Sequence, residues 1–130
     1  MREILFRGRD IAHNWHYGVP LIFTEDYVCI TAPHTYNKAV QPETVGQYTG
    51  LTDKNGKKIF EGDICRFREW NNGDMCWIGK VHYEHQQFLI SGDANKEFQT
   101  PFFLVMSRFI PKNIEVIGNI HDNPELLKGE

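Results

Sequence analysis

The stretch YTGLTDKNGKKIFEGDI, Tyr48–Ile64, holds the strongest structural signal in this chain. Near its centre, Asn55-Gly56 favours a type I′ turn, because that turn needs positive φ at both of its central residues. A turn centred there places Leu51 opposite Phe60, so that two apolar side chains share one face. Turn chemistry and apolar spacing therefore both predict a β-hairpin whose apolar face enters a core.

Charged residues and glycines around the turn extend this prediction. The same register places Asp53 opposite Lys58, which is a favourable opposite-charge pair across a hairpin. Gly50 and Gly62 flank the hairpin, and we expect a bend or bulge at each. The segment DICRFRE, Asp63–Glu69, then alternates as a strand does.

The rest of the chain contains short segments rich in β-branched and aromatic residues. Aromatic residues make up 13% of the chain, which suits a pleated sheet better than long helices. Strands of this length, joined by turn signals, are typical of an all-β barrel or sandwich. The further predicted strands are Glu3–Arg7, Asn14–Val19, Tyr27–Thr31, Met75–Glu84, Gln87–Ser91 and Ile114–His121.

Several segments between these strands read differently. Ala32–Glu43 holds two prolines and is interpreted as a linker between two lobes. Asn71–Asp74 predicts a second tight turn, and Asp93–Thr100 reads as a loop. Pro101–Ile110 fits either a buried strand or a helical segment, so the conformation of residues 93–112 stays open. After Asp122, a proline and a glutamate predict the start of a short helix.

Composition limits the class of protein. The length of 130 residues fits a single domain, and 41% apolar with 24% charged residues indicates a globular chain. The net charge of −3 argues against a dedicated nucleic-acid binder, which usually carries a basic excess. The start MREILFRGRD lacks the apolar core of a signal peptide, and no run reaches membrane-spanning length, so a cytosolic location is expected.

Three blocks of the sequence resemble the YopX family of phage and prophage proteins. FRGRDIAHNWHYG, Phe6–Gly18, is the first block, and PETVGQ with the hairpin, Pro42–Ile64, is the second. EVIGNIHDNPELL, Glu115–Leu127, is the third, and the blocks follow the order that the family shows. The middle of the chain, from about Trp70 to Ser107, carries little of this signature.

The resemblance implies a small all-β protein that includes an SH3-type barrel, encoded by a phage or prophage and located in a bacterial cytoplasm. The family has no established activity, cofactor or substrate, so no active-site residue is carried over. What the resemblance supplies is a set of structural motif positions. With Asn55 from the turn, they are Gly50, Asp53, Gly56, Glu61, Gly62, Asp63, Gly118, Asn119, Asn123 and Pro124.

Two pairs of residues suggest chemistry at first sight. Glu61 and Asp63 are close enough for acid–base work, but carboxylates around a glycine more simply accept backbone N–H bonds in a bend. His82 and His85 form an HxxH spacing, which would share a face on a helix and points to opposite faces on a strand. We therefore interpret the first pair as structural and the second as surface histidines.

The cysteines Cys29, Cys65 and Cys76 are odd in number and are expected to be reduced thiols. A turn centred on Asn72-Gly73 would place Cys76 opposite Glu69 and Cys65 opposite Lys80. The two thiols would then lie roughly 13 Å apart, too far for a disulfide. Small apolar residues are the simpler interpretation, and no metal is expected.

A basic face is the sharpest candidate for a ligand site. Two arginines and a tryptophan alternate on one predicted strand, and the hairpin lysines could extend them. Rings that stack on bases and cations that hold phosphates are what single-stranded nucleic-acid binding uses. The alternative is a solvated barrel face beside a soluble turn. The candidate contacts are Lys54, Lys57, Lys58, Arg66, Arg68 and Trp70.

Together these features predict one YopX-like domain over residues 1–130, with an N-terminal strand meander over about 1–43. A hairpin and an SH3-like barrel follow over about 44–127, with a short C-terminal helix. We expect no enzyme and no cofactor. The leading hypothesis is a phage accessory protein that binds itself as a homo-oligomer, or binds a host or phage protein. The alternative is a nucleic-acid-binding regulator that uses the basic face.

Overall fold

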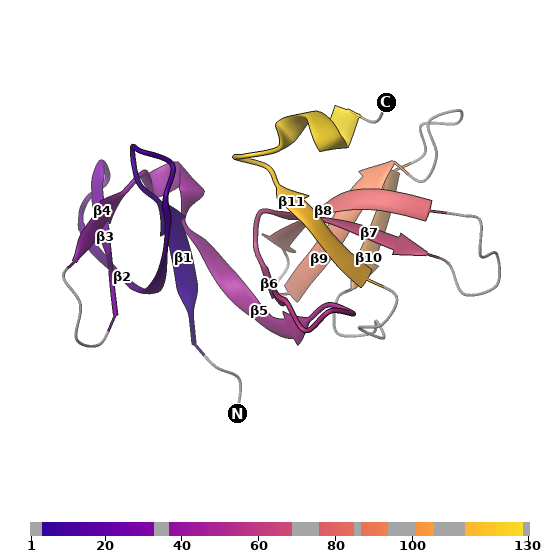
Figure 1. Ribbon diagram of the computed structural model, residues 1–130, viewed down its shortest axis with the longest axis horizontal. Helices are drawn as coiled ribbons and strands as arrows, with labels where there is room; N and C mark the ends of the chain where they lie inside the picture. Colours follow the sequence, from indigo (N-terminus) through magenta and orange to yellow (C-terminus); the bar gives the residue numbers. More distant parts are fainter. Residues whose placement is uncertain are drawn as a thin grey trace. The chain divides into compact units, whose positions relative to one another are not determined.

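The computed structural model describes residues 4–32, 37–68, 76–84, 87–93, 101–105 and 114–128. β-strands dominate these residues and pair in the antiparallel sense, so the all-β prediction is confirmed (Figure 1). The chain divides into two compact units, Met1–Gly50 and Leu51–Glu130. Within the described residues, no helix has the length and apolar character needed to cross a bilayer.

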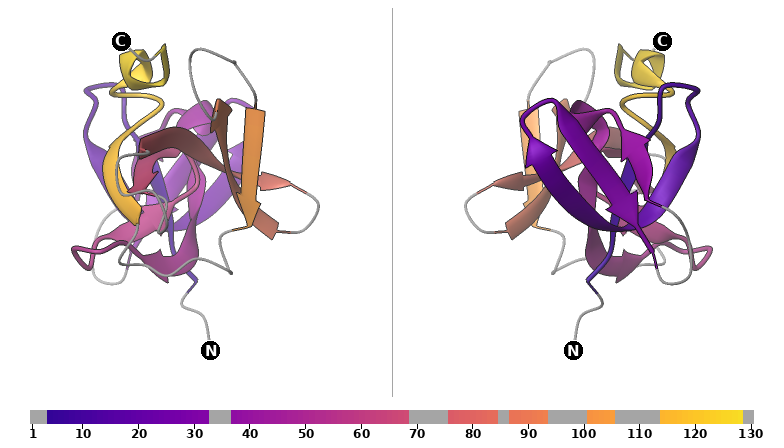
Figure 2. Two further views of the ribbon diagram at one scale, coloured as in Figure 1. Left: turned by 90° about the vertical axis from the view of Figure 1, so that its right-hand side faces the viewer. Right: turned by 90° about the vertical axis from the view of Figure 1, so that its left-hand side faces the viewer.

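The first unit is a meander of short strands around a small core. The hydrogen-bonded order is β4-β3-β2-β1-β5, and β5 also pairs with β6 (Lys58–Phe60) of the second unit. The right view of Figure 2 shows β1, β2, β3 and β4 in indigo and purple. Val28, Ile30 and Val40 are buried together, with Phe6 and Val45 packed against them. The elements are β1 (Phe6–Arg9), β2 (Trp15–Thr24), β3 (Tyr27–Thr31), β4 (Lys38–Val40), the 3-10 turn η1 (Pro42–Thr44) and β5 (Gly46–Thr52).

The predicted linker over Ala32–Glu43 is wrong. Its second half contains β4, which pairs with β3, and the start of η1. Val40 is 7% exposed and belongs to the core of the unit. A strand of three residues is too short to show an alternating pattern, and the prolines on either side of β4 favoured the interpretation as a linker. The division between the units falls inside β5, after Gly50.

The second unit holds an antiparallel sheet with the order β10-β9-β8-β7-β11. The core is formed by buried side chains from several strands, and Leu51 and Val116 pack against it. Its buried members are Ile59, Cys65, Val81, Phe88, Ile90 and Ile114. The elements are β6 (Lys58–Phe60), β7 (Asp63–Arg68), β8 (Cys76–Glu84), β9 (Gln87–Asp93), β10 (Pro101–Val105), β11 (Ile114–Asn119) and the 3-10 helix η4 (Pro124–Lys128).

The SH3-like barrel is not seen as a closed barrel. Over the residues that the structure describes, β10 and β11 are the two edges of an open five-stranded sheet. The C-terminal segment predicted to be a short helix is of the 3-10 type, over Pro124–Lys128. Pro101–Val105 is a strand, whereas the predicted turn at Asn71–Asp74 lies outside the described residues.

The hairpin exists, but its predicted register is wrong by one residue. The Asp53 N–H donates to the Lys57 carbonyl over 2.8 Å, and the Gly56 N–H donates to the Asp53 carbonyl over 3.0 Å. Gly56 has φ of +80°, whereas Asn55 is not among the described residues with positive φ. These are the features of a three-residue loop with a type I turn and a glycine bulge, not a type I′ turn.

The corrected register changes both predicted cross-strand pairs. Asp53 lies opposite Lys57 instead of Lys58, and the positive charge of Lys57 is one of the causes that lower the pKa of Asp53. Counting back along the strands places Ile59, not Phe60, opposite Leu51. Ile59 is fully buried in the core against which Leu51 packs. The apolar face of the hairpin therefore enters the core as predicted, through Ile59.

The side chain of Asp53 sets this register. Its Oδ1 accepts the Asn55 N–H over 2.8 Å and the Lys57 N–H over 2.9 Å. Its Oδ2 accepts the Val116 N–H over 2.9 Å, which ties the loop to β11. Burial of Asp53 works to raise its pKa, but the hydrogen bonds from Val116, Lys57 and Asn55 outweigh burial and lower the pKa.

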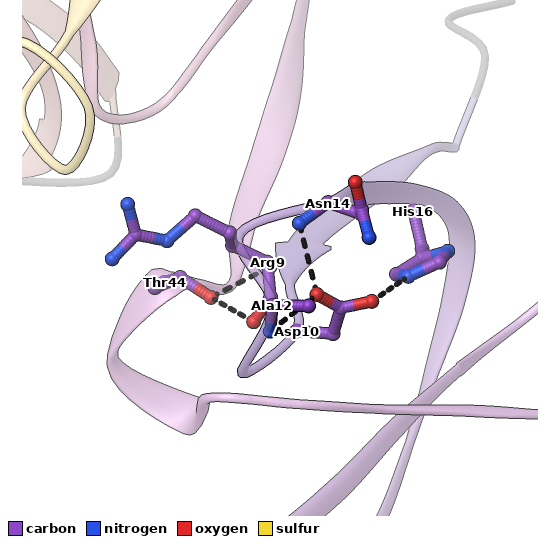
Figure 3. Close-up of polar contacts among 6 residues, drawn as sticks. All are labelled: Arg9, Asp10, Ala12, Asn14, His16 and Thr44. Atoms are coloured by element: carbon purple, nitrogen blue, oxygen red, sulfur yellow. Dashed lines mark hydrogen bonds and ion pairs between the residues drawn. The ribbon is translucent and has the colours of Figure 1, made fainter.

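The loop between β1 and β2 is built in the same way around Asp10 (Figure 3). The Asp10 N–H donates to the Asn14 carbonyl over 2.9 Å, and the His13 N–H donates to the Asp10 carbonyl over 2.9 Å. Oδ1 of Asp10 accepts the N–H groups of Ala12 and Asn14 over 2.9 and 2.8 Å. Its Oδ2 lies 2.8 Å from Nε2 of His16, and this contact is the largest cause that lowers the pKa of Asp10.

The two loops therefore share one hydrogen-bonding pattern, in which Oδ1 of an aspartate accepts the backbone N–H groups of the residues two and four positions later. The residue three positions later takes positive φ in both: Gly56 at +80° and His13 at +71°. Each second carboxylate oxygen makes a longer-range contact, to Val116 from Asp53 and to His16 from Asp10. Each unit thus contains one copy of this loop.

The predicted bends around the hairpin are confirmed. Gly50 and Gly62 have φ of +91° and +94°. Asp63 is 1% exposed, and its Oδ2 accepts the Phe60 N–H over 2.7 Å across the turn. The Gly62 N–H donates to the Val81 carbonyl over 2.8 Å, which fixes the turn against β8. Asp63 therefore organises a bend, as the sequence predicted.

The predicted irregularity at Gly118 is also confirmed. The pairing of β11 with β7 shifts between Val116 and Gly118, which is a β-bulge. A Cβ atom on Gly118 would lie 2.6 Å from Oδ1 of Asn123. That amide oxygen accepts the Asn119 N–H over 3.2 Å, so the bulge and the turn after it are one assembly.

The buried side chain of Asn119 stabilises the turn that follows the bulge. Its side chain is 9% exposed, and its Oδ1 accepts the N–H groups of His121 and Asp122 over 3.0 and 2.9 Å. The Asn123 N–H donates to the Asn119 carbonyl over 2.8 Å, and η4 begins at Pro124. The motif GNIHDNP is thus a turn that leads β11 into η4.

Candidate interaction surfaces

Part of the predicted basic face is assembled around Glu115. Arg66 and Glu115 are cross-strand partners on β7 and β11, and Nη2 of Arg66 lies 2.9 Å from Oε1 of Glu115. Nζ of Lys54 lies 3.7 Å from the same oxygen. The Arg66 hydrogen bond is the largest cause that lowers the pKa of Glu115. One carboxylate therefore offsets part of this positive charge.

The structure does not place the other four predicted nucleic-acid contacts beside Lys54 and Arg66. Lys57 and Lys58 are exposed on the hairpin. Arg68 lies on β7 opposite Cys76, and its side chain is not described. Trp70 lies outside the described residues. The structure thus brings Lys54 and Arg66 together and leaves the six-residue face undefined as a unit.

The cysteine register is also wrong by one residue. Cys65 lies opposite Gly79 instead of Lys80, and Cys76 lies opposite Arg68 instead of Glu69. Cys29 and Cys65 are buried and form no disulfide, which fits small apolar residues.

Among the described residues, the histidine and acidic pairs do not form part of a cluster of metal ligands. His82 is half-buried on β8, and His85 lies outside the described residues. Glu61 is half-buried beside the bend that Asp63 organises. In the part of the chain that the structure describes, no three His, Cys, Asp or Glu side chains gather as metal ligands would.

A different surface emerges on the first unit. Alternate residues of β2 point to one face, and Tyr17, Val19 and Leu21 on that face are 48%, 47% and 39% exposed. Their cross-strand neighbours on β1 and β3 include Arg7 and Cys29. Three apolar side chains in a row on one strand face are therefore open to solvent.

Two aromatic rings lengthen this row. The pairing of β2 with β3 shifts between Ile22 and Thr24, and Phe23 stacks on Tyr27 with ring centroids 5.1 Å apart. Phe23 and Tyr27 are each about half exposed. We call the row of Tyr17, Val19, Leu21, Phe23 and Tyr27 the β2 stripe.

Our reading of the sequence missed the β2 stripe, because the predicted strand ended at Val19. The strand nevertheless continues beyond Val19, and Pro20 pairs with Ile30 within the sheet. The detectable signal was the alternation that continues from Tyr17 to Phe23. Burial could not be read from that pattern, since alternating apolar residues usually face a core.

Comparison with known proteins finds a matching family and a similar solved structure. The family described as "YopX protein" matches residues 11–128. The crystal structure of protein EF1440 from Enterococcus faecalis is similar, with a TM-score of 0.59 and 25% sequence identity. That similarity covers 98% of this chain and 99% of the other. The comparison with curated proteins gave no match.

Proposed function

The chain belongs to the YopX family, and we propose that it is a non-enzymatic binding module that contacts proteins through the β2 stripe. One observation carries this proposal: five apolar side chains on one sheet face are about 39–56% exposed. Contiguous exposed apolar surface of this kind marks interaction sites in soluble proteins, whereas scattered exposed apolar residues are ordinary. Aromatic residues are also enriched at protein interfaces.

The setting that we propose is that of a phage accessory protein in the bacterial cytoplasm. Membership of the YopX family supports a phage association. Cys29 and Cys65 are buried and form no disulfide, which suits a reducing compartment. We also propose that the second unit is a variant of the SH3-like fold, supported by its five antiparallel strands and 3-10 helix.

Affinity capture with matched variants tests the binding function. The baits are the unmodified protein, Leu21→Glu on the β2 stripe, and Ile22→Glu on the other face of the same strand. Ile22 is 74% exposed, so both substitutions leave the core intact. We expect Leu21→Glu to lose proteins, including untagged copies of the chain, that the other two baits retain. Equal capture by all three baits would contradict a role for the β2 stripe.

Nucleic-acid binding is a second candidate, because the structure brings two of the predicted basic contacts, Lys54 and Arg66, together. Lys54 and Arg66 converge on Glu115, and Lys57 and Lys58 are exposed close by in sequence. Phosphate contacts by such side chains would make binding strongly dependent on salt.

The basic candidate predicts opposite effects of two charge changes on binding of labelled single- and double-stranded oligonucleotides. Glu115→Gln removes the offsetting carboxylate and should tighten binding at low salt. The double change Lys57→Glu with Lys58→Glu should abolish it. Fluorescence anisotropy at low and moderate salt measures both, and no binding by any variant at low salt would remove this candidate.

A further inference from the structure

We propose that the β2 stripe binds the β2 stripe of a second copy of this chain. The two β2 strands would stack face to face and run antiparallel, related by a two-fold axis that passes close to Pro20. This inference rests on the proposed binding function and names its partner. Dimers with two-fold symmetry use the same patch on both copies, so the patch must complement itself.

The order of side chains along β2 meets that requirement. Tyr17, Val19, Leu21 and Phe23 read as aromatic, aliphatic, aliphatic, aromatic in either direction. With the axis at Pro20, Tyr17 of one copy faces Phe23 of the other. Val19 likewise faces Leu21. Rings then meet rings at both ends, and branched aliphatic side chains meet at the centre, as in stacked sheets.

Charge at the two ends of the stripe points to the same arrangement. Glu25 and Asp26 form the exposed turn beyond Phe23. Beyond Tyr17 at the other end, the half-buried Arg9 is the cross-strand partner of Trp15, whereas Arg7 lies opposite Tyr17 and is 5% exposed beneath the Trp15 ring. The antiparallel stack brings the acidic turn of each copy to the arginine-bearing end of the other. Such complementarity favours one register over others.

Addition of a strand at the edge of β2 is a weaker alternative. β1 pairs with β2 only as far as Gly18, so the next residues of β2 have β3 as their neighbour in the described sheet. Pro20 has no N–H to offer an incoming strand, and proline is one of the residues that protect sheet edges. The face of β2 is therefore a better contact surface than its edge.

The size of the stripe predicts a weak dimer. An aromatic side chain presents about 150–250 Å², so the half-exposed stripe offers roughly 400 Å² per copy. Standard interfaces bury about 800 Å² per partner. We therefore expect dimerisation that depends on concentration, with a substantial dimer fraction at about 0.1 mM and little at about 1 µM.

Complementary charge changes test the register of the stack. Val19→Lys and Leu21→Glu each place a charge in the contact, and each variant alone should be monomeric at about 0.1 mM. In an equimolar mixture, the introduced lysine and glutamate face each other, while Leu21 of one chain faces Val19 of the other. Light scattering after size-exclusion chromatography should therefore show dimer again in the mixture.

Two controls make this outcome specific. Ile22→Glu lies on the other face and should dimerise like the unmodified protein. A mixture of Leu21→Lys with Leu21→Glu carries the same charges out of register, and it should recover at least about threefold less dimer. Circular dichroism melts confirm that every variant is folded.

The proposal is overturned if the unmodified protein is monomeric at about 0.1 mM, if Leu21→Glu alone still dimerises, or if both mixtures recover equally. A monomer whose stripe still captures another protein would overturn the self-pairing and leave the proposed binding function standing. A monomer whose stripe captures nothing would overturn both.

Discussion

Asp10 and Asp53 each hold a reversal of the chain with one side chain. In both loops the aspartate accepts two backbone N–H groups, and the residue three positions later takes positive φ. One loop has Gly56 at that place, and the other has His13. A side chain with a Cβ atom is disfavoured in that region of φ and ψ, so the two loops differ in strain although their hydrogen bonds agree.

This difference predicts opposite effects of two substitutions. Gly56→Ala should lower the free energy of unfolding by about 1 kcal/mol, because a Cβ there is disfavoured by φ. That Cβ would meet no atom within 4 Å, so no steric clash contributes. His13→Gly should raise the free energy of unfolding by up to about 1 kcal/mol, since it relieves the strain. Urea titrations measure both, and effects of the same sign would contradict the shared pattern.

The carboxylate of Asp53 predicts a pH-dependent loss of stability. Asp53→Asn keeps the shape but turns one amide N–H group toward the Val116 N–H, which should cost about 2 kcal/mol near pH 7. The pKa of Asp53 is lower in the folded protein than its ordinary value. Its stabilising contribution is therefore complete above about pH 4–5 and is lost as pH falls through the folded pKa.

Unfolding free energies of wild type and Asp53→Asn should thus converge as the pH falls below about 4. Asp26→Asn, on the exposed turn after β2, is the matched control and should change little at any pH. A gap between wild type and Asp53→Asn that stays constant down to pH 2 would show that the charge of Asp53 is not what stabilises the loop.

At the scale of the elements, the bulge of β11 requires a residue without a Cβ atom at Gly118. Gly118 packs against the Asn123 amide, and a Cβ would also lie 2.9 Å from Cδ1 of Leu126 on η4. Gly118→Val should therefore cost about 2–3 kcal/mol, because the turn that leads into η4 must move. Thermal unfolding measures this cost, and Gly56→Ala serves as the sterically free control. A Gly118→Val protein that melts like wild type would refute the close packing.

The same elements show what could be predicted from the sequence. The hairpin, the bends at Gly62 and Asp63 and the bulge at Gly118 follow from local chemistry, and the structure has them. The predicted register was wrong because it placed Asn55-Gly56 at the centre of a two-residue turn, whereas Asp53 and Gly56 are the first and fourth residues of a type I turn. Aspartate at the first position of a type I turn and glycine at the fourth are the usual pattern.

Longer-range features were harder to predict. β4 was hidden in a proline-containing segment, because a short strand is defined by its partner and not by its own pattern. The β2 stripe was not predicted, because the expected strand ended at Val19 and alternation does not say whether anything covers a strand face. The basic face was predicted from spacing alone, and the pairing of Arg66 with Glu115 depends on strands distant in sequence.

The whole molecule consists of two compact units, each with its own buried cluster. In the first unit, one face of the sheet carries the core of Val28, Ile30 and Val40, while the other carries the β2 stripe. A row of half-exposed apolar side chains on one face of a sheet is expected to find a partner. Association through the first unit should therefore leave the core of the second unit undisturbed.

Sedimentation velocity over a concentration series is the most direct test of this account. For the unmodified protein and for Ile22→Glu, the weight-average sedimentation coefficient should rise with concentration between about 1 µM and 0.1 mM. For Leu21→Glu it should stay at the monomer value throughout. A constant monomer value for the unmodified protein, or an unchanged rise for Leu21→Glu, would contradict the β2 stripe as the surface through which the protein associates.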